Sequence, residues 1–492
     1  MPKRKCVCTL IECCLYNIAK NIDNYWCFRY LRDTEKYLYV IGPFEELAEH
    51  LIEGLIKIFH KNKLLRHHHL KILLNSSIRK LNISGWNGDL GEIIPTVAVK
   101  CQKLTHLNIS GCSNIPLKAF LQLPESLPLV VSLNFGCTKC FDQVLGKIGK
   151  FCKHLRELDV SLTPVTDFGI SSLCINMDEL EDGKSSASKL IKLVISETKV
   201  TNKGARCALI NLPNLVNLEY HNSLDVVTEL YDCEYDRQYK LLQLSGENIK
   251  GERIHERYFE IAHTLCPNVT YLKLVDVALS DDDLLLCAGF ENLTQFQLLC
   301  GQTSSVTFYN GITALLQMRG TQITALELGD IDVINIPVIG QLCPNLELLS
   351  LYMIASYDYM FQHKLCDIAD PFSRLKELDL IFLHEVDIPE VFLKLLLTQA
   401  KHLRLFHLHN SESLSDQLFL DVLTVNPLSE IKDVAFEHCP HITGNMLKAL
   451  LMMENELETF NCLWCSNFTL REFQECEKYV REQNLDVNMQ WL

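Results

Sequence analysis

Four cysteines lie close together near the start of the chain, at Cys6, Cys8, Cys13 and Cys14. Such a cluster could bind a metal ion or form disulfides. The chain holds 22 cysteines in 492 residues, and in a long chain without a secretory signal this density is typical of reduced, buried thiols. A signal peptide is suggested by the basic segment Lys3-Arg4-Lys5 and the apolar run that follows it. However, Glu12 interrupts the run and no cleavage motif follows. We therefore expect a reducing compartment, the cytoplasm or the nucleus.

Two cysteine pairs have the spacing of zinc knuckles, Cys137-Thr-Lys-Cys140 and Cys462-Leu-Trp-Cys465. They fall in the third and the last of the repeats described below. Because stacked strands lie about 4.8 Å apart, the two pairs are too distant to share one ion. The run His67-His68-His69 stands beside Lys63 and Arg66, and we expect it to form a solvated turn. We predict neither a metal site nor a cofactor.

No catalytic motif is recognisable in the sequence. It has no Gly-rich phosphate loop, no Gly-x-Ser-x-Gly elbow and no His-Glu-x-x-His helix. Asp281-Asp282-Asp283 is interpreted as the cap and first turn of a helix, where the helix dipole favours carboxylates. The formal charge of -15 argues against nucleic-acid binding, and the absence of an uncharged apolar run of about 20 residues argues against a membrane span. We expect a protein that is not an enzyme.

One pattern recurs from Ile78 onward: an apolar residue, two variable positions, an apolar anchor, one variable position and an apolar residue. The central anchors are Leu81, Leu107, Leu133, Leu158, Leu193, Leu218, Leu272, Phe296, Leu326, Leu349, Leu378, Phe406, Val434 and Phe460. Most successive anchors are 23 to 30 residues apart, the period of leucine-rich repeats. The pattern predicts an α/β fold, a leucine-rich repeat solenoid with a curved parallel sheet and outer helices.

The repeats resemble the cysteine-containing leucine-rich repeats of F-box and related ubiquitin-ligase subunits. The resemblance covers most of residues 78–465 and is carried by segments such as Leu104-Thr-His-Leu-Asn-Ile-Ser-Gly-Cys112 and Leu342-Cys-Pro-Asn-Leu346. Small residues just after a strand are expected to turn inward and satisfy loop amides: Cys112, Thr163, Thr198, Cys439 and Cys465. Cysteines at the ends of the returning helices are expected to pack in the core: Cys101, Cys152, Cys266 and Cys343.

The sequence divides into three regions. Residues 1–70 lack the repeat pattern and are expected to be helical, residues 71–468 carry the repeats, and residues 469–492 are expected to form a helical cap that begins with an amphipathic helix over 469–484. Within the repeats, residues 221–262 lack a clean strand pattern, so they are either a degenerate repeat or an insertion. Residues 177–188 are acidic and rich in Ser and Gly, which predicts an exposed loop.

The first helical segment has an apolar stripe at helical spacing, Leu10, Cys14 and Ile18. Thr9-Leu10, three residues, Cys14, three residues and Ile18 match the elongin-binding box. Downstream, Phe44, Leu47 and Leu51 lie in a segment that resembles the cullin-contacting helix of von Hippel-Lindau-type receptors. The order of box, second helix and repeats resembles the Zyg-type and Zer-type substrate receptors and the leucine-rich antagonists of mitotic exit. The resemblance implies that these six residues bind an elongin-type adaptor and a cullin.

The sequence departs from these families in two places, and other interpretations remain open. Gly42 precedes Pro43 where the cullin segment has an aliphatic residue, and the Zyg and Zer families carry an armadillo-like region after their repeats. We therefore claim the receptor architecture and not membership. Residues 42–59 also resemble a degenerate F-box, which implies a Skp-type adaptor. In a third interpretation, both helices only cap the first repeat.

The variable positions of the repeat strands alternate with the buried anchors and project from the free face of the sheet. Early repeats place small polar residues there, such as Asn82, Asn108 and Asn134. Later repeats place larger side chains there: Tyr271, Leu348, Tyr352, Ile381, Leu405, His407 and His409. We expect a protein substrate to bind these residues, unless another segment covers them. Two functions stay open: the substrate-recognition subunit of a cullin-RING ubiquitin ligase, or a leucine-rich scaffold or inhibitor without a ligase.

Overall fold

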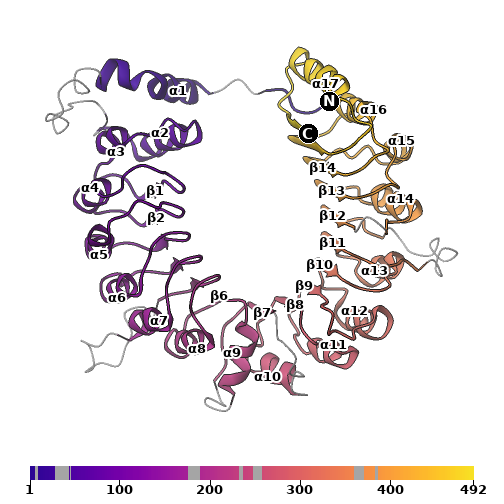
Figure 1. The fold of residues 1–492 in the computed structure, drawn as a ribbon, viewed down its shortest axis with the longest axis horizontal. Helices are drawn as coiled ribbons and strands as arrows, with labels where there is room; N and C mark the ends of the chain where they lie inside the picture. Colours follow the sequence, from indigo (N-terminus) through magenta and orange to yellow (C-terminus); the bar gives the residue numbers. More distant parts are fainter. Residues whose placement is uncertain are drawn as a thin grey trace. The chain divides into compact units, whose positions relative to one another are not determined.

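The computed structural model describes residues 1–5, 9–27, 44, 46–175, 189–231, 237–247, 257–358, 371–382 and 386–492. The chain divides into two compact units, which we call the N-terminal array (residues 8–243) and the C-terminal array (residues 1–7 and 244–492). Each array is a stack of strands with helices on one side of the sheet (Figure 1). We call the side of each sheet without helices its open face.

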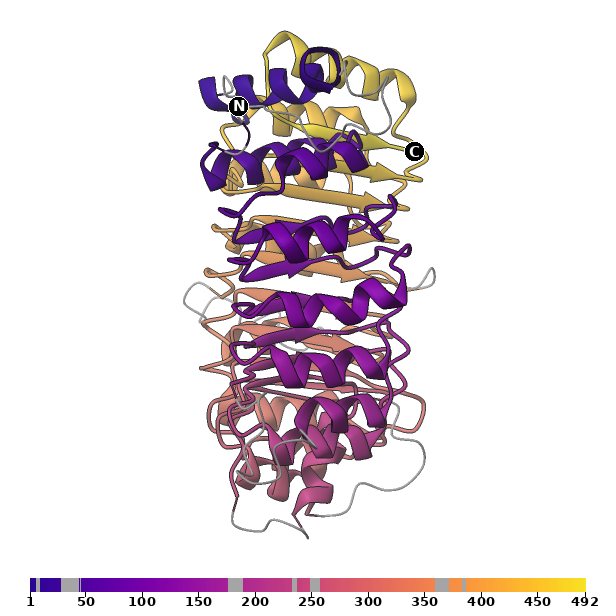
Figure 2. The same cartoon turned by 90° about the vertical axis from the view of Figure 1, so that its left-hand side faces the viewer.

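The N-terminal array begins with helices and continues as six repeats. Its first helices are α1 (Leu10–Ile22), η1 (Asp23–Cys27), α2 (Glu49–Lys61) and α3 (His67–Leu73). Its strands are β1 (Lys80–Asn82), β2 (His106–Asn108), β3 (Ser132–Asn134), β4 (Glu157–Asp159), β5 (Lys192–Val194) and β6 (Asn217–Glu219). Its further helices are α4 (Ile93–Lys100), α5 (Leu117–Ser126), α6 (Asp142–Phe151), α7 (Asp167–Cys174), α8 (Asn202–Asn211) and α9 (Ser223–Leu230). The strands pair in chain order and in parallel, and Figure 2 shows the helices stacked in the same order.

The C-terminal array contains ten parallel strands, again in chain order. They are β7 (Gln243–Glu247), β8 (Tyr271–Val275), β9 (Gln295–Leu299), β10 (Ala325–Gly329), β11 (Leu348–Tyr352), β12 (Glu377–Ile381), β13 (Leu405–His409), β14 (Asp433–Glu437), β15 (Thr459–Leu463) and β16 (Asn488–Trp491). The helices are α10 (Tyr258–Leu265), α11 (Asp281–Cys287), η4 (Phe308–Ile312), α12 (Thr313–Arg319), α13 (Ile336–Leu342), α14 (Glu390–Gln399), α15 (Asp416–Val425), α16 (Gly444–Met452) and α17 (Leu470–Glu482).

The predicted leucine-rich repeat solenoid is confirmed. Every central anchor of the sequence pattern, from Leu81 to Phe460, lies in a strand and is buried. Within each sheet, anchors of neighbouring repeats pair with one another, as Leu378 does with Phe406. Because strand side chains alternate, the residues on either side of an anchor point to the open face. Many strands are followed directly by a residue with positive φ, such as Asp330 after β10 and Asn410 after β13.

Successive repeats are joined by a hydrogen-bonded pair at the starts of their helices. In α16, the N-cap Thr443 donates its backbone N–H (2.8 Å) and its hydroxyl (2.5 Å) to the carboxylate of Asp416 in α15. The same arrangement joins Thr166 to Asp142, Thr201 to Asp167 and Thr307 to Asp281. The carboxylate thus holds the next helix while it occupies the favourable first turn of its own helix.

The repeat cysteines are part of the packing. Cys101, Cys152, Cys266 and Cys343 are buried C-cap residues of their helices, as the sequence predicted. Burial raises the pKa of Cys101 and Cys343 to about 12, so these thiols stay protonated. The expectation that the residues after the strands satisfy loop amides holds for Thr198, which accepts the N–H of Val200 (3.3 Å), and for Cys465, which accepts that of Cys439 (3.4 Å). Cys112 and Thr163 instead donate to the carbonyls of Ile83 (3.2 Å) and Val160 (2.5 Å).

The sequence pattern did not predict two of the strands. β7, all of α9 and the first part of α10 lie within residues 221–262. β7 pairs with β8 although Gly246 occupies the position of its last apolar residue. β16 follows α17 and forms the last strand of the C-terminal array. α17 itself matches the helix predicted over 469–484, and Thr469 caps it in a reciprocal pair with Glu472. Residues 177–188, predicted to be an exposed loop, lie outside the described residues.

The first five residues belong to the C-terminal array. Lys5 donates its backbone N–H to Asn484 (2.8 Å), and the N–H of Asp486 is donated to Lys3 (2.8 Å), so the segment pairs antiparallel with the chain between α17 and β16. The Lys3 ammonium lies 3.0 Å from the Glu456 carboxylate. In the described part of the chain, no helix is long and apolar enough to cross a membrane.

Candidate functional site

α1 is a well-capped helix with two different apolar faces. Thr9 caps it, because the backbone N–H of Glu12 is donated to Thr9 Oγ1 (3.2 Å) and that of Thr9 to Glu12 Oε2 (2.8 Å). Leu15, Ala19 and Ile22 form the buried face of the helix. That face packs on α2, where Gly54 leaves room for the Leu15 side chain.

The second apolar face of α1 carries the residues of the elongin-type box. Leu10 is 80% exposed, Cys14 is exposed and Ile18 is half-buried. Ile11, 55% exposed, lies between this stripe and the buried face. Because the helix is held by its buried face, the stripe is presented to solvent as an apolar strip.

The end of α1 is fixed to α3 by a partly buried polar cluster. The Nε2 atoms of His68 and His69 donate to Asp23 Oδ1 at 2.7 and 2.8 Å, and Arg66 lies 3.3 Å from Asp23 Oδ2. Burial opposes ionisation of Asp23, but the two histidine hydrogen bonds outweigh it and lower the pKa of the carboxyl. The expected solvated turn at residues 67–69 is wrong: His69 is 2% exposed and stacks on Phe59.

Asp23, His68 and His69 also form the one group of metal-ligating types found close together among the described residues. A histidine that binds a metal through Nε2 donates its other ring nitrogen to an acceptor. In His69 the other nitrogen, Nδ1, instead accepts the backbone N–H of Arg66 (3.2 Å), so Nε2 carries the proton. The geometry therefore fits a hydrogen-bonded clamp and does not fit a metal site.

α2 covers the edge of the N-terminal sheet. β1 is the edge strand, and the backbone N–H groups of Arg79 and Lys80 are donated to the carboxylates of Glu49 (2.9 Å) and Glu53 (3.2 Å) on α2. Burial and the neighbouring Glu49 raise the pKa of Glu53. The edge strand is thus protected from pairing with another chain.

The remaining predicted adaptor residues lie near this edge cap. Phe44 is only 2% exposed, and its carbonyl accepts the side-chain N–H of Asn75 (3.1 Å). Leu47 and Leu51 are half-buried. Of the six predicted residues, Leu10, Cys14 and Ile18 are therefore brought together on one surface, while Phe44 is part of the interior.

The predicted substrate residues all lie half-buried on the open face of the C-terminal array. The register places Tyr352, Ile381 and His409 side by side on β11, β12 and β13, and Leu348 and Leu405 on either side of Glu377. Tyr271 lies apart from them on β8, where its hydroxyl donates to Gln297 (2.8 Å). Among the described residues, the hydrogen bonds and ion pairs of this face are made within the sheet and its loops.

Sequence reasoning missed the carboxylates between these residues. Glu327, Asp379 and Asp433 occupy the same kind of variable strand position as Leu348 and His407. The Tyr352 hydroxyl donates to Asp379 (3.4 Å), and His409 lies 2.8 Å from Glu437. The alternation that identified the apolar residues also covers these positions. The acids could therefore have been found from the sequence by considering the charge of each variable residue as well as its size.

Comparison with known proteins agrees with the fold. Residues 100–115 and 151–174 match the model of the leucine-rich repeat family. No curated protein sequence matches the chain significantly. These two segments, together with the parallel strand order and the buried anchors, define a leucine-rich repeat protein of the solenoid class.

Solved structures with similar folds come from varied organisms. The complex of Rad7 and Elc1 from yeast contains a chain with 14% identity and a TM-score of 0.46, covering 95% of this chain and 96% of that one. An internalin of Listeria monocytogenes has 18% identity and a TM-score of 0.35, covering 84% and 96%. A leucine-rich repeat protein of Leptospira interrogans has 14% identity and a TM-score of 0.34, covering 94% and 97%.

Proposed function

We propose that this protein is the non-catalytic substrate-recognition subunit of a cullin-RING E3 ubiquitin ligase. It would bind an elongin-type adaptor through α1 and a protein substrate on the open face of the C-terminal array, acting in the cytoplasm or the nucleus. The observation that carries the proposal is the exposure of Leu10 and Cys14 on a helix whose other face is already packed. Burying one exposed leucine side chain in a partner's pocket contributes about 2 kcal/mol.

The different contacts of α1 and α2 support the interpretation that α1 binds an adaptor over the interpretation that it only caps the first repeat. The carboxylates of Glu49 and Glu53 on α2 accept the backbone N–H groups of Arg79 and Lys80 at β1, so α2 already covers this sheet edge. α1 lies on α2 and adds an exposed apolar stripe that capping does not require. The F-box interpretation draws on residues 42–59, where Ile52, Leu55, Ile56 and Phe59 are buried inside the array. The alternative function, a scaffold or inhibitor without a ligase, remains the competing outcome of the experiment below.

The test measures binding of a purified elongin-type adaptor to the full chain by calorimetry, with a Skp-type adaptor in parallel. Leu10→Asp and Cys14→Arg place charges on the stripe and are expected to abolish adaptor binding. Tyr16→Asp, an exposed position outside the stripe, and Val99→Asp, an exposed apolar position on α4, are matched controls expected to bind normally. Binding of the Skp-type adaptor alone would select the F-box interpretation, and binding of neither would favour the scaffold.

A further inference from the structure

The open face of the C-terminal array is acidic along its central strands. Its variable positions carry five carboxylates, Glu327, Glu377, Asp379, Asp433 and Glu437. In the described strands β9 to β16, none of the positions that alternate with the buried anchors is Lys or Arg. Lys273, on β8, is paired with Glu247 at 2.5 Å. The face therefore has a strong excess of negative charge.

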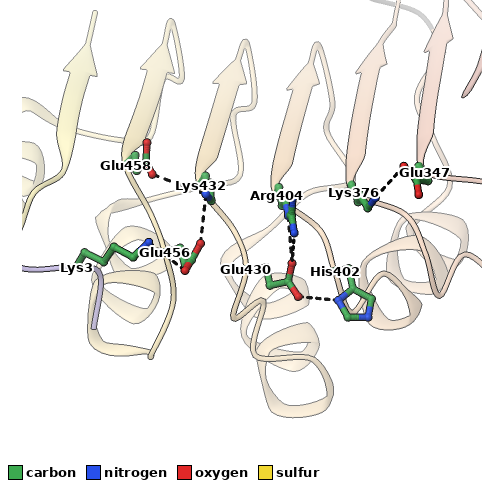
Figure 3. Close-up of polar contacts among 9 residues, drawn as sticks. All are labelled: Lys3, Glu347, Lys376, His402, Arg404, Glu430, Lys432, Glu456 and Glu458. Atoms are coloured by element: carbon green, nitrogen blue, oxygen red, sulfur yellow. Dashed lines mark hydrogen bonds and ion pairs between the residues drawn. The ribbon is translucent and has the colours of Figure 1, made fainter. Parts of the chain in front are cut away.

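Cations beside this face are already neutralised. The residue before each of three strands is basic, and Figure 3 shows these side chains paired in an alternating row that we call the edge ladder. Lys376 lies 2.8 Å from Glu347, Arg404 lies 3.0 Å from Glu430, and Lys432 lies 3.3 Å from Glu456. The edge ladder therefore has little positive charge left to offset the carboxylates of the open face.

Several polar atoms on the face have no hydrogen-bond partner. Asp433 Oδ1 and His407 Nε2 are 3.5 Å apart, both are shielded from solvent, and neither makes a hydrogen bond. Asp379 Oδ1 is also shielded from solvent and makes no hydrogen bond. Burial raises the pKa of Glu327, Lys273 lowers it, and the nearby charge of Asp379 raises it again. Crowded carboxylates on a half-exposed face favour a ligand whose donors carry positive charge.

The spacing of the acids favours one backbone conformation in a ligand. Glu327 and Asp379 lie in one register row on β10 and β12, and Glu377 and Asp433 lie in the neighbouring row on β12 and β14, so the two acids of each row are two strands apart. Strands about 4.8 Å apart give a lateral repeat of about 9.6 Å. A polyproline II segment repeats every three residues, over about 9.3 Å. Such a segment crossing the strands would present every third side chain to a carboxylate.

We propose that the open face of the C-terminal array binds an extended cationic polypeptide segment with Arg or Lys at every third residue. Tyr352, beside Asp379, offers an aromatic face to a guanidinium, while Ile381 and Leu405 contact the aliphatic stems. The inference rests on the proposed function only in that the segment would belong to the ligase substrate. Binding of the segment does not require the adaptor.

The test uses the full chain and a labelled peptide of repeated Arg-Ser-Pro, with binding measured by fluorescence anisotropy. Peptides of equal charge with adjacent arginines, and a Glu-Ser-Pro peptide, are the comparison probes. The Asp379→Asn, Asp433→Asn double variant keeps the side-chain shapes and is expected to bind the Arg-Ser-Pro peptide about tenfold more weakly. The matched control, Asp282→Asn with Glu291→Gln, removes the same charge from exposed sites near the helices and should change affinity by less than about twofold.

Equal losses in the double variant and its control would mean that only net charge attracts the peptide, and would overturn the proposal. So would the absence of binding, or tighter binding of the adjacent-arginine peptide. Because the peptide measurement contains no adaptor and the adaptor measurement contains no peptide, either proposal can fail while the other stands.

Discussion

Leu15 of α1 lies directly over Gly54 of α2. A Cβ atom placed on Gly54 would come within 2.9 Å of Leu15 Cδ1, so the absence of a side chain at Gly54 sets how closely the two helices approach. This close approach buries Leu15 to 8% exposure while Leu10, five residues earlier, stays in solvent. The contact thus decides which apolar side chains of α1 remain available to a partner.

Gly54→Phe should displace α1 from α2. Losing the burial of Leu15 costs about 2 kcal/mol, so local opening of α1 should increase at least about tenfold. We expect trypsin to cleave after Lys20 correspondingly faster, and adaptor binding to weaken. In Gly54→Ala the small Cβ requires only a shift of the flexible end of Leu15, and α1 should stay as protected as in the unmodified protein. Equal cleavage rates for all three proteins would contradict this role of Gly54.

The Asp23 clamp should make stability depend on pH. Burial lowers the pKa of His69, and the pKa of Asp23 is lowered as well, despite its burial, by the two histidine hydrogen bonds. A lowered pKa in the folded protein means that the contribution of His69 is present above 6.5, its ordinary value, and is lost as the pH falls through the lowered value. Unfolding by denaturant between about pH 7 and pH 5 should therefore show a smaller loss of stability in His69→Gln than in the unmodified protein.

Asp23→Ala tests the same clamp at neutral pH. It leaves the buried Nε2–H of His69 without its acceptor, which costs about 1–3 kcal/mol. The midpoint of denaturant unfolding should fall accordingly. A midpoint equal to that of the unmodified protein would show that the clamp does not stabilise the array.

Asp416→Ala should weaken the contact between α15 and α16. The change removes both hydrogen bonds from Thr443 and leaves its backbone N–H uncapped, at a cost of about 1–3 kcal/mol. Asp282→Ala, in the exposed first turn of α11, should cost less than about 0.5 kcal/mol. Denaturant unfolding curves of the two variants distinguish the loss of a hydrogen bond between repeats from the loss of a favourable interaction with the helix dipole, because both carboxylates make the dipole interaction.

Cys207 should be an unusually reactive thiol. A hydrogen bond from Cys174 lowers the pKa of Cys207 to about 6 although partial burial raises it, and Ser171 (3.7 Å) and Asn211 (3.6 Å) donate as well. Because the thiolate is the nucleophile, iodoacetamide at about pH 6.5 should label Cys207 faster than the exposed Cys137. Ser171→Ala should slow the labelling of Cys207 only, as followed by peptide mass spectrometry. Faster labelling of Cys137 would contradict the prediction.

The repeat strands could be predicted because their signal is periodic and local. Each anchor, such as Leu378, is followed at a fixed offset by another buried residue, and burial of that alternation is what forms the strand. β7 departs from the pattern at Gly246, where pairing with β8 forms the strand despite the missing side chain. β16 follows the last helix and has no next repeat, so no period pointed to it.

The clamp and the acidic face depend on contacts that periodicity does not encode. Asp23 and His69 are 46 positions apart and belong to no repeat, so His67-His68-His69 looked like a solvated run beside Arg66. The apolar stripe of α1 was visible in the sequence, but which side of it stays exposed depends on Gly54. The carboxylates of the open face were visible as residues, and only the strand register shows which of them lie in the same row.

The pairing of Lys3 and Lys5 with residues 484–486 has a consequence for biosynthesis. The ribosome makes the first strand segment about 480 residues before its partner, which at about 5–20 residues per second is a wait of roughly half a minute or more. During that interval Pro2, buried in the finished protein, has no site to occupy. These backbone hydrogen bonds therefore form only after the repeats that precede residue 484 have been made.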